Sequence, residues 1–175
     1  MKRTLMLFAM ILTLRAPLAH AGDPGMSTHQ GSADFEKLKT LAGTWEGASA
    51  TTGQQAAAPV TVEYAVSSNG SILLEKLMPG TPQEMVTVYY ERGGKIQLTH
   101  YCAVGNQPQM DLASHEGNKF NFVFSDKNAI DPGQEAHMHA LTLEINGDNN
   151  LTQHWTFFKD GKAVEVHSFQ FIRKK

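Results

Sequence analysis

Cysteine is nearly absent from this 175-residue sequence, in which Cys102 is the single example. One thiol cannot form an internal disulfide, and it excludes the paired Cys motifs of structural zinc sites and dithiol redox enzymes. A lone cysteine most often packs as a small buried apolar side chain. A role for Cys102 as a metal ligand or nucleophile stays open as the alternative.

Basic residues are also scarce, with 15 Lys and Arg against 17 Asp and Glu and a formal net charge of −2. They form no basic stripe, so we expect no nucleic-acid partner. The sequence contains no P-loop, dinucleotide fingerprint or Ser-His-Asp motif, and no glycosidase-like pair of carboxylates. We therefore expect a binding protein more than an enzyme.

Long apolar runs are limited to residues 5–14, LMLFAMILTL, which follow Lys2 and Arg3. Ten residues are too few to span a bilayer. A basic start, a short apolar run and the small-x-small tripeptide at 19–21 are together typical of a secretory signal peptide cleaved after Ala21. The sequence thus predicts an exported protein, periplasmic or secreted, with no membrane span.

The remaining chain divides into a Gly- and Ser-rich flexible lead-in at 22–33 and one domain at 34–175. After removal of the signal, which holds three basic residues and no acidic one, 12 basic residues face 17 acidic ones and the net charge is −5. About 150 residues suffice for one domain with a substantial core. Apolar residues at helical spacing predict one short helix at 34–41, which Gly43 ends.

Alternating apolar and polar residues predict strands throughout the rest of the domain. The expected strands are 44–51, 59–67, 71–78, 85–91, 95–103, 109–115, 119–125, 137–146, 151–158 and 163–173. Tight-turn pairs such as Asn69-Gly70 and Gly93-Gly94 separate many of them. Because no helical pattern intervenes, the strands should form an antiparallel meander, and closure would remove its exposed edges. The predicted fold class is all-β, a closed up-and-down antiparallel barrel of about ten strands with one short N-terminal helix.

Both chain ends carry residues that fit such a barrel. The stretch LAGTWEG, with Gly43, Thr44 and Trp45, follows the helix, and Arg173 lies in the last strand. This arrangement resembles the calycin superfamily, which includes lipocalins, fatty-acid-binding proteins and nitrobindin-like barrels. The resemblance implies that the indole packs beneath the arginine. Such a cation–π contact would tie the first strand to the last.

Turn lengths predict which end of the barrel is open. The connections at one end are tight, whereas those at 51–59, 79–84 and 126–136 at the other end are mostly longer. Loops at a barrel mouth commonly form the binding site. Strand parity places apolar and ligand-type side chains on inward faces near this end. The predicted lining residues are Leu98, His100, Cys102, Met110, His137, His139, Leu141 and Trp155.

Within this set, the pair His137 and His139 in the segment HMH has the side chains best suited to metal binding or catalysis. Two imidazoles on one strand face could join His100 and Cys102 in a zinc or copper site. They could instead make hydrogen bonds near the rim, or act in acid–base chemistry.

Three hypotheses of function remain open. The first is an exported barrel that binds a small, mostly apolar molecule. The second is a metal or haem protein, because nitrobindin-like barrels bind haem through a histidine near the C-terminal part of the barrel, and such a protein could have redox or isomerase activity. The third is a structural envelope protein. The strings LTHYCAVGNQPQM and HMH also resemble segments of uncharacterised exported bacterial proteins, a group to which no activity is attached.

Overall fold

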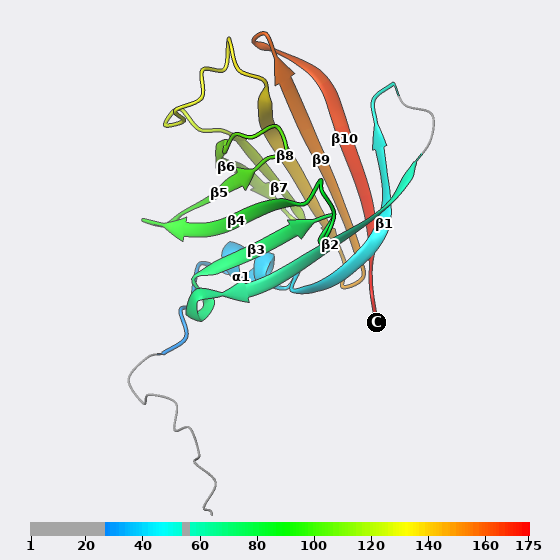
Figure 1. The fold of residues 1–175 in the computed structure, drawn as a ribbon. Helices are drawn as coiled ribbons and strands as arrows, with labels where there is room; N and C mark the ends of the chain where they lie inside the picture. Colours follow the sequence, from blue (N-terminus) through cyan, green and yellow to red (C-terminus); the bar gives the residue numbers. More distant parts are fainter. Residues whose placement is uncertain (1–26, 54–56) are drawn as a thin grey trace, which may run out of the picture.

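The protein folds as a ten-stranded closed barrel, seen in a computed structural model that describes residues 27–53 and 57–175 (Figure 1). The predicted signal peptide at 1–21 lies outside the described residues. All neighbouring strands pair antiparallel in chain order, and the last strand pairs with the first. The predicted fold class is therefore confirmed.

The described elements follow the predicted order closely. They are α1 (Ala33–Lys39), β1 (Gly43–Thr51), β2 (Ala58–Ser67), η1 (Ser68–Gly70), β3 (Ile72–Leu77), β4 (Met85–Arg92), β5 (Lys95–Tyr101), β6 (Gln109–Glu116), β7 (Lys119–Phe124), β8 (His137–Asn146), β9 (Asn150–Lys159) and β10 (Lys162–Arg173). Within the described ranges, no helix has the length and apolar character needed to cross a lipid bilayer.

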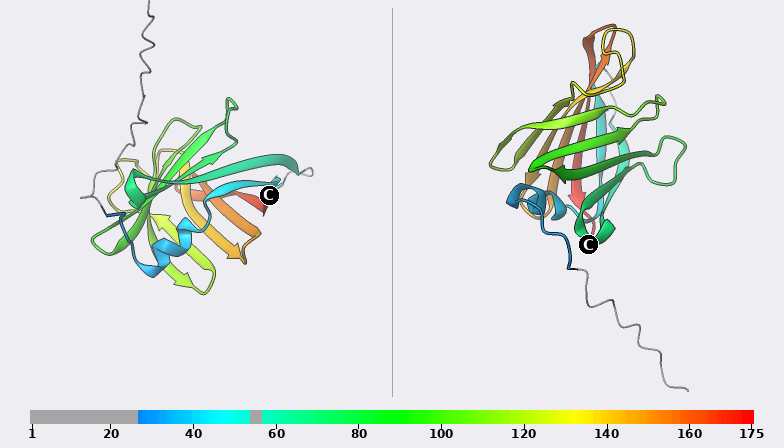
Figure 2. Two further views of the ribbon diagram at one scale, coloured as in Figure 1. Left: turned by 90° about the horizontal axis from the view of Figure 1, so that it is seen from below. Right: turned by 90° about the vertical axis from the view of Figure 1, so that its left-hand side faces the viewer.

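The α1 helix lies at one end of the barrel, as the views in Figures 1 and 2 show. Ser32 caps it by accepting a hydrogen bond from the backbone N–H of Phe35, and Phe35 and Leu38 are fully buried. Residues 27–32, which belong to the predicted flexible lead-in, are hydrogen-bonded to the fold. His29 donates to the carbonyl of Asn69, for example. The helix and this segment thus cover the lower end and leave the other end for an opening.

The seam between β1 and β10 closes the barrel at Trp45 and Arg173. These residues are paired across the two strands, and the Arg173 guanidinium lies 4.0 Å from the centroid of the Trp45 ring. Arg173 also donates to the carbonyls of Thr40, Ala42 and Asp148, each at 2.7 Å. The arginine therefore joins the end of α1, the β8–β9 turn and both seam strands.

Gly47 leaves no room for a side chain in the same seam, and its substitution should disturb closure. A Cβ at this position would lie 1.8 Å from the carbonyl oxygen of Gln170 on β10. Backbone cannot yield as a flexible side chain can, so we expect Gly47→Ala to lower the free energy of unfolding by about 1–3 kcal/mol. Denaturant unfolding would measure it. Ser49→Ala on the same strand is the control, and equal midpoints for the two variants would contradict the prediction.

Candidate functional site at the barrel mouth

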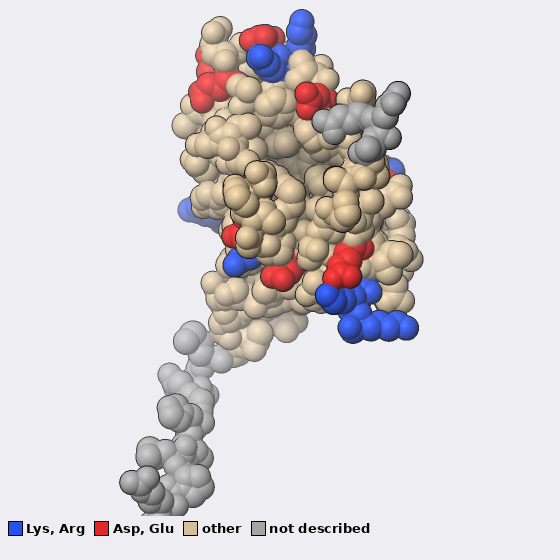
Figure 3. All heavy atoms as spheres, turned by 45° about the vertical axis from the view of Figure 1, so that its right-hand side comes forward, with Lys and Arg blue, Asp and Glu red and all other residues tan. Residues whose placement is uncertain are grey.

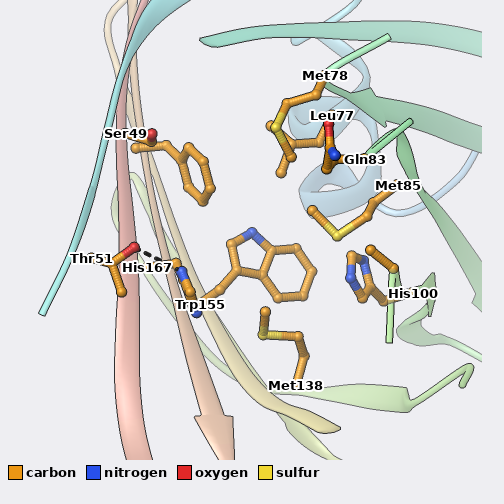
Figure 4. A pocket seen from close by; sticks show the side chains of 12 residues that line it. Ser49, Thr51, Leu77, Met78, Gln83, Met85, His100, Met138, Trp155 and His167 are labelled. Atoms are coloured by element: carbon orange, nitrogen blue, oxygen red, sulfur yellow. Dashed lines mark hydrogen bonds between the residues drawn. The ribbon is translucent and has the colours of Figure 1, made fainter. Parts of the chain in front are cut away.

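A cavity of about 260 Å³ lies inside the barrel at the end opposite α1 (Figure 4). Its lining comes from seven strands and two of the connections between them. The residues are Ser49, Thr51, Leu77, Met78, Gln83, Met85, His100, Ala103, Met138, Trp155, His167 and Phe169. Thr51, Leu77 and Met138 lie at strand ends adjoining the three longer connections, so the cavity occupies the end that the turn lengths predicted.

The lining is mainly apolar and contains no Lys, Arg, Asp or Glu. In Figure 4 the side chains of Met78, Met85 and Met138 surround the indole of Trp155. On the face drawn in Figure 3, charged side chains lie mostly toward the upper and lower ends, and the band between them is largely uncharged. The site therefore suits an uncharged, largely apolar molecule.

His100 is the main polar feature of the cavity wall. It is only 1% exposed, and its ring lies 4.5 Å from that of Trp155. Its Nδ1 is 3.0 Å from the hydroxyl of Thr87, the residue opposite it on β4. Its Nε2 is buried and has no hydrogen-bond partner among the described residues. A buried polar atom without a partner is unusual, and here it belongs to a side chain that lines a cavity.

Burial also fixes the charge of this imidazole. Loss of water around the ring lowers the pKa of His100 from 6.5 to about 4. The side chain is therefore neutral at physiological pH. It can offer a hydrogen bond to a bound molecule but no positive charge.

Below the cavity, polar side chains cross the core in a group that we call the buried polar belt, consisting of Tyr64, Glu75, Thr87, Tyr89, His100 and Gln153. Trp155 donates from its indole N–H to Gln153 Oε1 at 3.0 Å, and the amide of Gln153 bonds to the hydroxyl of Tyr64. Tyr89 donates to Glu75 Oε2 at 2.6 Å, while Glu75 Oε1 has no partner among the described residues. Burial raises the pKa of the Glu75 carboxyl. The wall of the cavity is thus held in place by hydrogen bonds deeper in the barrel.

Register aligns four members of the belt on consecutive strands. Tyr64 pairs with Glu75, Glu75 with Thr87, and Thr87 with His100. Sequence reasoning did not find this row, although parity contained the signal: Glu75 shares a strand face with the core residues Leu73 and Leu77. A carboxylate on an otherwise apolar face indicates an internal polar site.

The structure corrects the inward placement of the HMH histidines. The β8–β9 register shifts between Met138 and Ala140, so His139 has no partner of its own on β9. A bulge of this kind reverses the inward and outward faces of the residues before it. Met138 therefore lines the cavity, while neither His137 nor His139 does.

The two histidines instead form a cluster with aromatic side chains. His137 Nε2 lies 3.0 Å from His139 Nδ1, and His137 Nδ1 lies 2.7 Å from the carbonyl oxygen of Glu135. The His139 ring stacks between Phe124 and Phe158, with centroid distances of 5.1 and 3.7 Å. Burial lowers the pKa of His139, and the charge of His137 lowers it further. These contacts match hydrogen bonding near the rim, one of the three roles considered for the pair.

The other predicted lining residues fall into two groups. Trp155, like His100, lines the cavity. Leu98, Met110 and Leu141 are fully buried core residues outside its lining. Cys102 lies just beyond the end of β5, half-buried against the core, and burial raises the pKa of its thiol. A raised pKa favours the neutral thiol over the thiolate that ligation or attack requires.

The expected convergence of His100, Cys102, His137 and His139 is not found. Among the residues that the structure describes, no three His, Cys, Asp or Glu side chains lie close enough together to hold a metal ion. The β8 bulge gives the physical reason, because it turns the HMH pair away from the cavity that His100 lines. The metal-ligand atoms that the cavity itself offers are the unpartnered Nε2 of His100 and three Met thioethers, because both ring nitrogens of His167 contact other side chains.

Comparisons with known proteins bear on the fold alone. No family model and no curated protein matches the sequence. The barrel is similar to a solved structure from Nostoc punctiforme, a protein of unknown function from the DUF3598 family, with a TM-score of 0.50 and 12% identity. The similarity covers 88% of this chain and 53% of that one, so this chain spans about half the length of its structural neighbour.

Proposed function

We propose that this protein is an exported barrel that binds one small, mostly apolar molecule in the mouth cavity. The observation that carries the proposal is the unpartnered Nε2 of buried His100 in the wall of an otherwise apolar cavity. Ligand pockets commonly combine apolar walls with a few placed polar groups. A bound molecule would supply the missing hydrogen bond and cover the apolar wall.

The size and the methionines of the cavity bear on what it would bind. About 260 Å³ is slightly below the range of about 300–1,000 Å³ of drug-sized ligand pockets. The ligand is therefore small, or part of it extends through the mouth. Met side chains are unbranched and adapt to irregular shapes. With Met78, Met85 and Met138 in the wall, the protein would accept a class of related molecules.

A fluorescence titration with a neutral probe, N-phenyl-1-naphthylamine, would test the proposal by measuring its binding directly. We expect saturable binding with a stoichiometry of one. Ser49→Phe should reduce binding at least about tenfold, because the ring would occupy the cavity. Ala50→Phe is the matched control, because the neighbouring side chain on β1 is exposed and does not line the cavity. An equal loss in both variants, or binding that does not saturate, would contradict the proposal and favour a structural envelope protein.

A metal protein is the second candidate, supported by the donors of the cavity. Thioether and imidazole ligands suit copper(I) better than zinc. A titration of the reduced protein with copper(I) would test His100, Met78, Met85 and Met138 as ligands. Stoichiometric binding that His100→Leu abolishes would support this candidate over the apolar ligand.

The residues do not fit haem in the way that the family resemblance implies. His137 and His139 lie outside the cavity lining, and both ring nitrogens of His137 have partners. Native mass spectrometry of protein purified from its natural producer would distinguish among the apolar ligand, a metal and haem in one experiment. A retained organic molecule of a few hundred daltons or less supports the proposed function, whereas a metal or haem mass overturns it.

We also propose that the protein belongs to the calycin superfamily and that it is exported. The Trp45–Arg173 contact at the seam supports calycin membership, because it matches the contact that the resemblance implied. The basic start, the apolar run at 5–14 and the tripeptide at 19–21 support export. Mass analysis of the protein in the extracytoplasmic fraction tests this, with a mature N-terminus at Gly22 as the expected result.

A further inference from the structure

We infer that the ligand is a neutral molecule with a hydrogen-bond acceptor at its buried end, such as a ketone, aldehyde or ester, and that His100 Nε2–H donates to this acceptor. The inference rests on the proposed function and specifies its substrate class. Three observations carry it: the Thr87 contact, the partners of the other polar groups, and the charge of the cavity.

The hydroxyl of Thr87 fixes the tautomer of His100. Thr87 is 1% exposed, and its hydroxyl contacts His100 Nδ1 at 3.0 Å and no other acceptor among the described residues. If Nδ1 carried the proton, the buried hydroxyl hydrogen would have no acceptor, at a cost in stability. The hydroxyl therefore donates to Nδ1, and the proton of the neutral ring lies on Nε2. The cavity thus presents a donor.

Among the residues that line the cavity, His100 carries the one buried side-chain polar atom without a partner in the described part of the chain, because Glu75 and its unpartnered Oε1 lie outside the lining. The Trp155 indole N–H donates to Gln153. Near the rim, the Thr51 hydroxyl bonds to His167 Nδ1 at 3.0 Å. The other polar lining residues, Gln83 and Ser49, belong to the β3–β4 connection and the outer part of β1. They therefore lie toward the mouth and not at the buried end of the cavity. His100 Nε2–H is consequently the group that selects the buried end of the ligand, with the apolar remainder pointing toward the mouth.

The absence of charge in the cavity lining favours a ligand with a neutral acceptor over one with a carboxylate. The cavity lining has no Lys or Arg, and His100 is neutral because burial lowers its pKa to about 4. A fatty-acid carboxylate would lose its hydration there without gaining a countercharge, which is costly. A carbonyl oxygen accepts the same hydrogen bond at a much smaller desolvation cost. The site therefore discriminates against fatty acids.

The first test needs no variant. The 15N chemical shifts of the His100 ring in the wild-type protein distinguish a protonated from an unprotonated ring nitrogen. We expect a protonated Nε2 and an unprotonated Nδ1 at pH 7, and a mixture of tautomers in Thr87→Val. A proton on Nδ1 in the wild type overturns the inference and favours a metal or a donor ligand.

The second test compares three eight-carbon probes, octane, octan-2-one and octanoate, by displacement of N-phenyl-1-naphthylamine. Octane and octan-2-one lose different amounts of hydration on binding, so the quantity to compare is the ratio of their affinities in wild type and in His100→Leu. We expect the variant to lower the affinity for octan-2-one relative to octane about 2- to 10-fold, the value of one net hydrogen bond, and to leave octane binding nearly unchanged. Octanoate should bind most weakly to the wild type.

The outcomes separate the inference from the proposed function. The same ratio of octane to octan-2-one affinities in wild type and in His100→Leu, or tightest binding of octanoate, overturns the inference alone. Failure of the reporter probe and of all three eight-carbon probes to bind overturns the proposed function as well.

Discussion

Trp45→Ala should lower the free energy of unfolding by about 3–5 kcal/mol, the usual cost of truncating a large buried aromatic side chain. Trp45 is fully buried, and its indole N–H donates to the carbonyl oxygen of Leu41 at 2.8 Å. The variant would leave that carbonyl and the Arg173 guanidinium without the indole, at the point where β1 meets β10. Denaturant unfolding monitored by far-UV circular dichroism measures the loss.

Two further variants show whether the loss comes from the seam. Arg173→Met removes the guanidinium, which donates to three carbonyl oxygens, and should cost less than Trp45→Ala but clearly more than zero. Ile172→Ala is the control, because its side chain is 65% exposed and surface substitutions usually change stability by at most about 0.5 kcal/mol. A loss below about 1 kcal/mol for Trp45→Ala would show that the barrel closes without this contact.

Strand positions could be predicted from the sequence because the local signals agree with the global fold. Turn pairs such as Asn69-Gly70 mark the reversals, and alternation marks the buried faces between them. The predicted strands match the described ones to within two residues at every end. The helix predicted at 34–41 spans Ala33–Lys39. In an antiparallel meander each strand contacts its sequence neighbours, so local patterns determine most of the topology.

The site was only partly predictable because parity counts fail across a bulge. His100 and Trp155 were placed correctly, since no register shift interrupts the inner parts of β5 and β9 beside them. His137 and His139 were misplaced, since the bulge at Met138–Ala140 inverts the start of β8. Nothing in the alternation of HMHALTLEI reveals an extra residue. The bulge coincides with tertiary contacts that the local pattern does not contain, here the stacking of His139 between Phe124 and Phe158.

The partners of His100 were harder to foresee because they come from other strands. Thr87 lies on β4, and the two residues meet only when the β4–β5 register is known. A polar residue with inward parity could be recognised from the sequence, but its hydrogen-bond partner could not. The donor character of His100 Nε2 depends on that partner, so the chemistry of the cavity becomes apparent only in three dimensions.

Glu75 should give the protein an unusual dependence of stability on pH. The carboxyl is 1% exposed, receives one hydrogen bond from Tyr89, and faces no Lys or Arg in the buried polar belt. Burial raises its pKa above the ordinary value of 4.5. Burial and the charge of Glu75 raise the pKa values of Tyr64 and Tyr89 as well, so both phenols remain neutral across the pH range of the test.

The sign of the effect follows from proton linkage. The folded state binds the Glu75 proton more tightly than the unfolded state does. The contribution to stability is therefore complete below about pH 4.5, the unfolded-state value, and is lost as pH rises through the folded-state pKa. Above that pKa the protein bears the cost of a buried uncompensated carboxylate, which amounts to several kcal/mol in general.

Glu75→Gln should remove this dependence, since the amide keeps an oxygen for Tyr89 and never ionises. The stability of the variant relative to wild type should rise as pH increases from 4 to 8, measured by urea unfolding at each pH. His100 also titrates, with a pKa of about 4, but both proteins contain it and its contribution cancels. Glu63→Gln, at an exposed position on the adjacent strand β2, is the control. A constant difference between Glu75→Gln and wild type would mean that Glu75 stays protonated throughout or that water reaches it, and the buried polar belt would then carry no charge cost.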